Sequence, residues 1–173
     1  MAINVKPMTG DDHSTLLISL PKSAMEHAMT WNPDDFVIDA LGRSGVTARR
    51  LDAAEARALS VRVLETFGLR LNGFFWDKEG PHDSVSVRNV DGEEMIPDFV
   101  GARPCFFISM YAKQIWAFAS GDDLRAALAQ MYMSEFSVCD AEVSYLLCFN
   151  HHDYLIGWGD ARTWVSLKPE KID

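Results

Sequence analysis

Residues that could perform metal or nucleophilic chemistry gather in one short stretch near the C-terminal end of the sequence. Cys148 precedes the adjacent pair His151 and His152, and Asp153 follows them. Zinc accepts thiolate, imidazole and carboxylate ligands, and a cysteine activated by a histidine can act as a nucleophile. The stretch therefore allows three interpretations: a metal site, a catalytic group or a polar turn between two strands.

The spacing of these residues favours the turn. Asn150 and Asp153 flank the histidines, and both residue types favour turns because their side chains bond nearby backbone groups. Neighbouring side chains of an extended chain point to opposite faces, so His151 and His152 would not easily bind one ion. We therefore predict a hairpin turn with no catalytic residue, no metal and no cofactor. The alternative is a metal site formed by Cys148, His152 and Asp153.

Two glycine-containing segments invite a phosphate-binding interpretation but lack the rest of the pattern. Gly157 and Gly159 follow an expected strand, whereas the dinucleotide fingerprint needs a third glycine and a full helix. We interpret them as a strand end before a short capped helix that starts at Asp160. Gly42–Arg50 lacks the Lys-Ser/Thr ending of a phosphate loop. We interpret it as a connection between two helices.

The hydrophobic pattern divides the chain into a helical first third and a remainder rich in strands. Capping residues and apolar stripes predict helices over 19–31, 32–42, 52–68 and 120–133. Runs with strand character cover 69–76, 84–90, 104–110, 114–120, 144–149 and 154–158. The segment 132–140 is interpreted as a connection between a helix and a strand. Trp116 and Trp158 are expected in the core.

This order of elements predicts an α+β fold. Consecutive strands with short connections imply mostly antiparallel pairing. Helices gathered at one end of the sequence disfavour a doubly wound sheet. We predict a single globular domain over 1–173, with N-terminal helices followed by a mostly antiparallel sheet of about six strands and one inserted helix.

Composition, the start of the sequence and the cysteine count indicate the class of protein and its cell compartment. The chain of 173 residues is 48% hydrophobic and 24% charged, which is typical of a globular protein. The start of the sequence has no secretory signal pattern, and the longest apolar runs are too short to span a bilayer. Three cysteines, an odd number, predict buried reduced thiols in a cytoplasmic protein: Cys105, Cys139 and Cys148.

The net charge and its distribution along the sequence indicate which classes of partner are favoured. The net charge of −9 disfavours nucleic acid and anionic membrane surfaces as partners. Between Asp77 and Asp98, two basic residues stand against seven acidic ones: Asp77, Glu79, Asp83, Asp91, Glu93, Glu94 and Asp98. This segment is either a solvated hairpin and loop or an acidic patch that attracts a basic partner. Phe75 and Trp76 would then anchor the interface.

At the level of size, charge and layout, the chain resembles the small, acidic, cytosolic α+β proteins that bacteria make as immunity partners of toxins. The leading hypothesis is accordingly a non-enzymatic module that binds and occludes a basic protein. The alternative is a metal-assisted or cysteine-dependent hydrolase centred on Cys148, His151, His152 and Asp153. A sensor with an apolar pocket for a small ligand is a third hypothesis.

Overall fold

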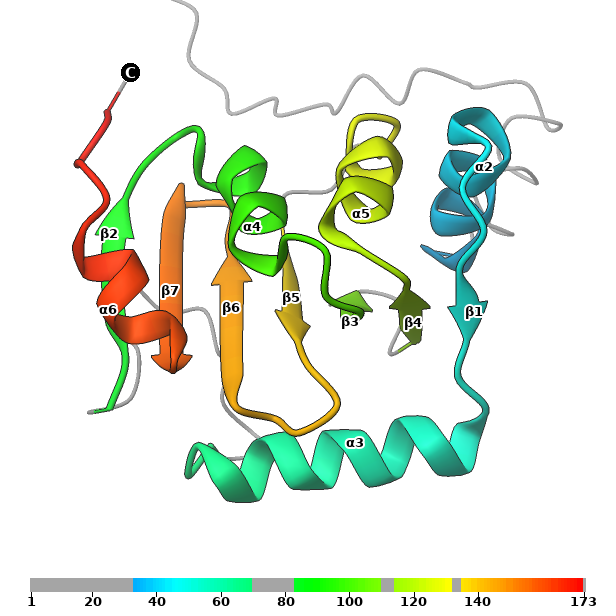
Figure 1. Ribbon diagram of the computed structural model, residues 1–173, viewed down its shortest axis with the longest axis horizontal. Helices are drawn as coiled ribbons and strands as arrows, with labels where there is room; N and C mark the ends of the chain where they lie inside the picture. Colours follow the sequence, from blue (N-terminus) through cyan, green and yellow to red (C-terminus); the bar gives the residue numbers. More distant parts are fainter. Residues whose placement is uncertain (1–32, 70–82, 110–113, 132–134, 173) are drawn as a thin grey trace, which may run out of the picture. The chain divides into compact units, whose positions relative to one another are not determined.

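A seven-stranded antiparallel sheet organises the part of the chain that the computed structural model describes, residues 33–69, 83–109, 114–131 and 135–172. The strand order is β1-β4-β3-β5-β6-β7-β2, and every neighbouring pair is antiparallel (Figure 1). The strands are β1 (Arg49–Arg50), β2 (Val85–Arg88), β3 (Cys105–Ser109), β4 (Ile115–Phe118), β5 (Phe136–Cys139), β6 (Tyr145–Phe149) and β7 (Tyr154–Gly159).

Five helices of the described residues cover the sheet. They are α2 (Pro33–Ser44), α3 (Ala53–Thr66), α4 (Gly92–Val100), α5 (Gly121–Leu128) and α6 (Ala161–Ser166). All described residues belong to one unit, Asn32–Asp173. The predicted α+β class is confirmed. That one domain extends over 1–173 stays a prediction.

The two faces of the sheet carry separate hydrophobic cores, and β6 shows why. Tyr145, Leu147 and Phe149 belong to one core, whereas Leu146 and Cys148 belong to the other. Successive side chains of a strand point to opposite faces, so a strand buried throughout must be covered twice. Buried residues of α2, α4, α5 and α6 cover the first face. Buried residues of α3 belong to the second core, and Figure 1 shows this helix lying crosswise below the lower ends of the strands.

Helices α4 and α5 are packed closely against each other. The Gly121 N–H donates to the carbonyl of Gly101 at 2.7 Å, which joins the start of α5 to the end of α4. A Cβ atom at Gly121 would lie 2.2 Å from the carbonyl oxygen of Pro97. Glycine therefore permits a backbone approach that no other residue allows.

Several local predictions are confirmed. Asp52 caps α3, and the reciprocal bond from the Asp52 N–H to the Glu55 carboxylate completes the capping box. The hairpins β3–β4 and β6–β7 form as expected. The three cysteines are free and buried, and Trp116 and Trp158 are in the core. No described helix is long and apolar enough to cross a membrane.

Other predictions need correction. Residues 49–50 and 136–139 form β1 and β5 rather than connections. Together with five of the six predicted strands, they make the seven strands of the described residues. The segment 92–100 is helix α4 rather than hairpin or loop. Because β1 precedes α3, three described helices lie between strands: α3, α4 and α5. Asp160 makes no capping bond with its side chain to α6. The helix predicted over 19–31 and the strand predicted over 69–76, apart from Leu69, lie outside the described residues.

Candidate functional site

The predicted turn between β6 and β7 is present, and its polar side chains contact the turn backbone or neighbouring elements. The Asp153 carboxylate pairs with Arg88 of β2 at 3.5 Å. The side-chain oxygen of the fully buried Asn150 accepts from the N–H of His152 and from that of Tyr154, each at 3.0 Å. The Asp153 N–H donates to the Asn150 carbonyl at 3.0 Å, and Asp153 adopts a positive φ of 63°. Asparagine and aspartate suit these positions because they tolerate that geometry and bond locally.

The two histidines lie side by side, contrary to the expectation that they point to opposite faces. Their ring centroids are 3.9 Å apart, because residues 151–152 belong to the turn and the alternation of an extended chain does not apply. His151 Nδ1 pairs with the carboxylate of Glu135, a residue that precedes β5 and whose side chain is buried. His152 is exposed at the surface of the turn.

Cys148 lies apart from this surface, on the α3 side of the sheet. It is fully buried, and its Sγ lies 3.1 Å from Ser137 Oγ. Burial raises the pKa of the Cys148 thiol well above its ordinary value. A thiol reacts as its thiolate, so this environment disfavours nucleophilic attack. Among the described residues, no three His, Cys, Asp or Glu side chains gather where they could hold a metal ion.

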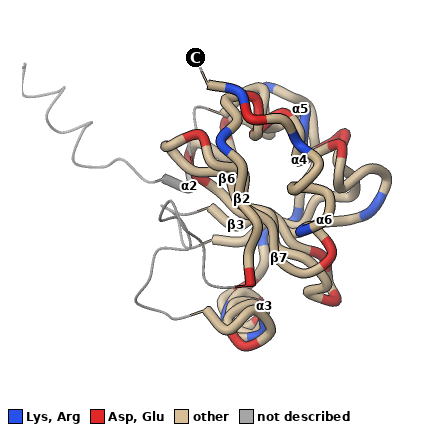
Figure 2. The backbone as a smooth tube through the Cα atoms, turned by 90° about the vertical axis from the view of Figure 1, so that its left-hand side faces the viewer, with Lys and Arg blue, Asp and Glu red and all other residues tan. Residues whose placement is uncertain are grey.

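The acidic segment is partly neutralised by cations from distant parts of the chain. The Asp91 carboxylate accepts from Lys171 Nζ at 2.5 Å, and Asp98 accepts from Arg125 at 2.6 Å. Figure 2 shows basic and acidic residues interspersed over the described chain rather than separated. Asp83 is exposed and precedes β2. Phe75, Trp76, Asp77 and Glu79 lie outside the described residues.

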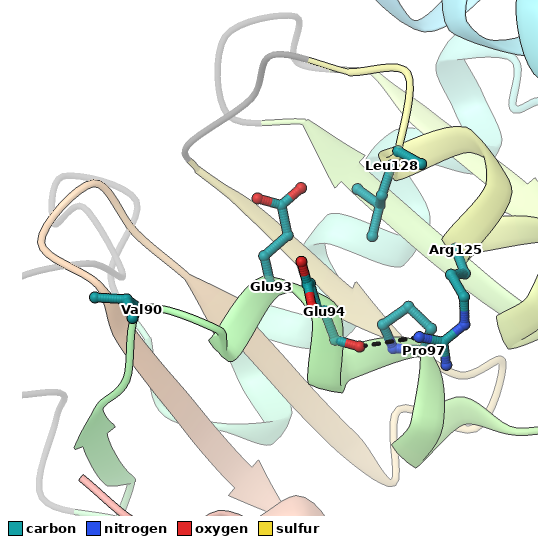
Figure 3. Close-up of a pocket in the computed structure, with 7 residues that line it drawn as sticks. Val90, Glu93, Glu94, Pro97, Arg125 and Leu128 are labelled. Carbon is teal, nitrogen blue, oxygen red and sulfur yellow. Dashed lines mark hydrogen bonds between the residues drawn. The ribbon is translucent and has the colours of Figure 1, made fainter. Parts of the chain in front are cut away.

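Glu93 and Glu94, the other two acidic residues of this segment, line a pocket between α4 and α5. The pocket has a volume of about 370 Å³, and its lining is completed by Val90, Pro97, Arg125, Leu128 and Ala129 (Figure 3). Glu93 makes no hydrogen bond or ion pair with any described residue, whereas Arg125 is held at Asp98 and at the carbonyl of Glu94. Figure 3 shows the Glu93 carboxylate and the Arg125 guanidinium pointing to different parts of the pocket.

Partial burial changes the protonation of Glu93. Loss of solvation raises the pKa of its carboxyl group to about 7, and the negative charge of Glu94 adds to the effect. A carboxyl group that titrates near neutral pH in a pocket is typical of functional sites, although ion-pair networks can also shift a pKa. Here desolvation and the charge of Glu94 raise the pKa, and no cation among the described residues pairs with Glu93 to lower it.

Glu93 and Glu94 belong to the acidic residues predicted from the sequence to bind a partner, whereas the other residues of the pocket were not predicted. Arg125, Leu128 and Ala129 come from α5, about thirty residues further along the chain than α4. Leu128 is buried in the core as well as lining the pocket, and its spacing in the sequence gives no indication of a pocket. The one available signal was the apolar stripe Met95, Ile96, Phe99 and Val100, which indicates that the acidic segment contains an amphipathic helix.

The fold and this pocket define an α+β protein with an open seven-stranded sheet and a half-buried carboxylate between two of its covering helices. No family model, no curated protein and no solved structure matches the chain.

Proposed function

We propose that this chain is a non-enzymatic acidic module that binds and occludes a basic protein, as bacterial immunity proteins and antitoxins do with their toxins. The observation that carries the proposal is the unequal pairing of the acidic residues around α4. Asp91 and Asp98 have cationic partners, whereas Glu93 and Glu94 have none among the described residues. The unpaired carboxylates leave local negative charge that a basic partner can neutralise.

The net charge of −9 supports the same proposal from longer range. Electrostatic attraction acts over about 8 Å at physiological ionic strength and mainly accelerates association. The apolar pocket walls beside the carboxylates supply the desolvated contacts that slow dissociation. In such a complex, α4 and α5 would cover the contacting surface of the partner and block its access to other molecules.

The experiment has two stages. The chain is first used to capture binding proteins from its native host, and the captured proteins are identified by mass spectrometry. Association and dissociation rates of the purified partner are then measured for the wild type and for Glu94→Lys. Glu142→Lys is the matched control. Glu142 is exposed in the turn between β5 and β6, and its substitution changes the net charge by the same amount.

We expect a basic partner whose association rate falls about tenfold with Glu94→Lys at low salt. The effect should shrink at 1 M salt, where the screening length is about 3 Å. Glu142→Lys should change the rate much less. A neutral or acidic partner, or an association rate equally affected by both variants at low salt, contradicts the proposal.

A further inference from the structure

We propose that the pocket between α4 and α5 receives a cationic side chain, arginine or lysine, with Glu93 as its counter-ion. This inference rests on the proposed function, because it names the group of the basic partner that the acidic surface recognises. It also assigns different roles to neighbouring residues: Glu93 binds inside the pocket, and Glu94 attracts from the surface.

The charges in the pocket are arranged for one incoming cation. Arg125 is the one basic residue among the described lining residues, and Asp98 and the carbonyl of Glu94 already hold its guanidinium. Arg125 therefore does not neutralise Glu93. A charge-assisted hydrogen bond to an arginine or lysine would satisfy the Glu93 carboxylate, which has no other partner in the described chain.

The walls match the rest of such a side chain. Val90, Pro97, Leu128 and Ala129 present aliphatic surface around the carboxylate, in a space of about 370 Å³. Arginine and lysine bury their methylene stems against apolar surface while the charged group remains with a polar partner. A neutral aliphatic side chain would fit the walls but would leave Glu93 unpaired, so the pocket distinguishes the two kinds of ligand.

The protonation of Glu93 provides a direct readout of occupancy. Burial penalises the ionised carboxylate of the free protein, with Glu94 and Arg125 as the other charged groups that line the pocket. A cation bound next to the carboxylate favours its ionised form. Occupancy therefore lowers the pKa of Glu93 and releases a proton to solvent when binding takes place near neutral pH.

The test uses small probes, so it does not depend on finding the partner. The full chain is titrated at low salt and pH 8 with Nα-acetyl-arginine methylamide and Nα-acetyl-lysine methylamide, and binding is followed by NMR. Nα-acetyl-norleucine methylamide is the neutral probe. The carboxyl carbon of Glu93 gives its pKa with and without saturating probe. Glu93→Gln is compared with Glu94→Gln, which removes the same charge one residue away at an exposed position.

We expect at least one cationic probe to bind at the pocket and to lower the pKa of Glu93 by about one unit or more. Glu93→Gln should weaken that binding about tenfold or more, and Glu94→Gln by less than about threefold. The inference is overturned if neither cationic probe binds there, if norleucine binds as well as the cations, or if both variants weaken binding equally.

This outcome is separable from that of the proposed function. If Glu94→Lys slows association with a captured basic protein but no probe binds at Glu93, the module stands and the pocket assignment fails. If a probe binds at Glu93 but no basic partner depends on Glu94, the pocket is a cation site and the module fails.

Discussion

The β6–β7 turn and the α4–α5 pocket are both rich in polar side chains, but they use them in opposite ways. In the turn, the side-chain oxygen of Asn150 accepts two backbone N–H groups, and His151 pairs with Glu135. In the pocket, Glu93 is half-buried and has no partner among the described residues. The side chains of Asn150 and His151 therefore stabilise the fold. The carboxylate of Glu93 remains accessible to a ligand.

The difference shows that an unusual cluster of residue types is a weaker guide to function than a count of hydrogen-bond partners. A carboxylate that loses part of its solvation without gaining a partner costs free energy, so such a group needs an explanation. Cys148, His151, His152 and Asp153 attract attention by their chemistry alone, yet the positions of these residues follow from strand pairing and turn geometry. Glu93 attracts attention only when the surroundings of its carboxylate are known.

The largest effect on stability is expected from Gly121→Ala, which disrupts the close packing of α4 against α5 that forms the pocket. The added Cβ would lie 2.2 Å from the Pro97 carbonyl oxygen, and α4 and α5 would have to separate. We expect the free energy of unfolding to fall by about 3 kcal/mol, measured by urea denaturation. Gly42→Ala in α2 is the control, because nothing lies within 4 Å of its Cβ. It should be neutral or stabilise by up to about 1 kcal/mol. Equal stability of both variants would contradict the close packing.

A smaller loss is expected from Asn150→Ala in the turn. The variant removes the buried side chain that accepts from the partly buried N–H groups of His152 and Tyr154. We expect a loss of about 2 kcal/mol in the free energy of unfolding. His152→Ala, in the same turn but at an exposed position, should change stability by less than about 0.5 kcal/mol. If the histidine variant cost as much as the asparagine variant, the stability of the turn would not depend mainly on the hydrogen bonds of Asn150.

The substitution Glu93→Gln in the pocket should stabilise the protein near neutral pH, in contrast to the two preceding variants. The folded pKa of Glu93, about 7, lies above the ordinary value of 4.5, so the folded state binds the proton more tightly than the unfolded state. Wild-type stability should therefore fall as pH rises from about 4.5 to 7. Above pH 7, Glu93→Gln should be more stable than the wild type by about 1–2 kcal/mol, allowing for partial exposure.

This gain should be absent below about pH 4.5, where the carboxyl group is protonated in both states. Thermal denaturation at pH 4.5 and pH 8 measures the difference. Glu94→Gln serves as the matched control and should show less than half of it. A Glu93→Gln variant that loses stability at pH 8 would mean that the carboxylate has a stabilising partner.

The last prediction concerns the buried thiol of Cys148 and its reactivity rather than the stability of the fold. Because Cys148 is fully buried with a raised pKa, iodoacetamide should label it at least about a hundredfold more slowly in the folded than in the urea-unfolded chain. Peptide mapping by mass spectrometry measures each cysteine separately. Cys105 and Cys139, which are also buried, provide the internal comparison. Selective fast labelling of Cys148 in the folded chain would revive the hydrolase hypothesis.

Elements with strong local signals could be predicted from the sequence. Asp52 and Glu55 are three residues apart at the start of α3, and their capping box needs nothing beyond that segment. Elements without such signals were missed. Acidic residues flank the apolar stripe of α4, which makes the helical period hard to see. The helix also contains Pro97, which has no N–H to donate to the Glu93 carbonyl and therefore argues against a helix. Strand β5 has only four residues, all buried, so neither period is visible in it.

The sequence by itself determined the α+β class, the β6–β7 turn and the acidic character of the chain, because hydrophobic period, turn chemistry and charge are local or additive properties. Only the tertiary structure decided which carboxylates of the acidic segment form ion pairs and which, Glu93 and Glu94, have no cationic partner among the described residues. Asp91 and Asp98 find cations 80 and 27 residues away, and Leu128 and Ala129 close a pocket around Glu93. Solvation and pairing depend on neighbours that the fold brings together, and spacing along the chain does not reveal them.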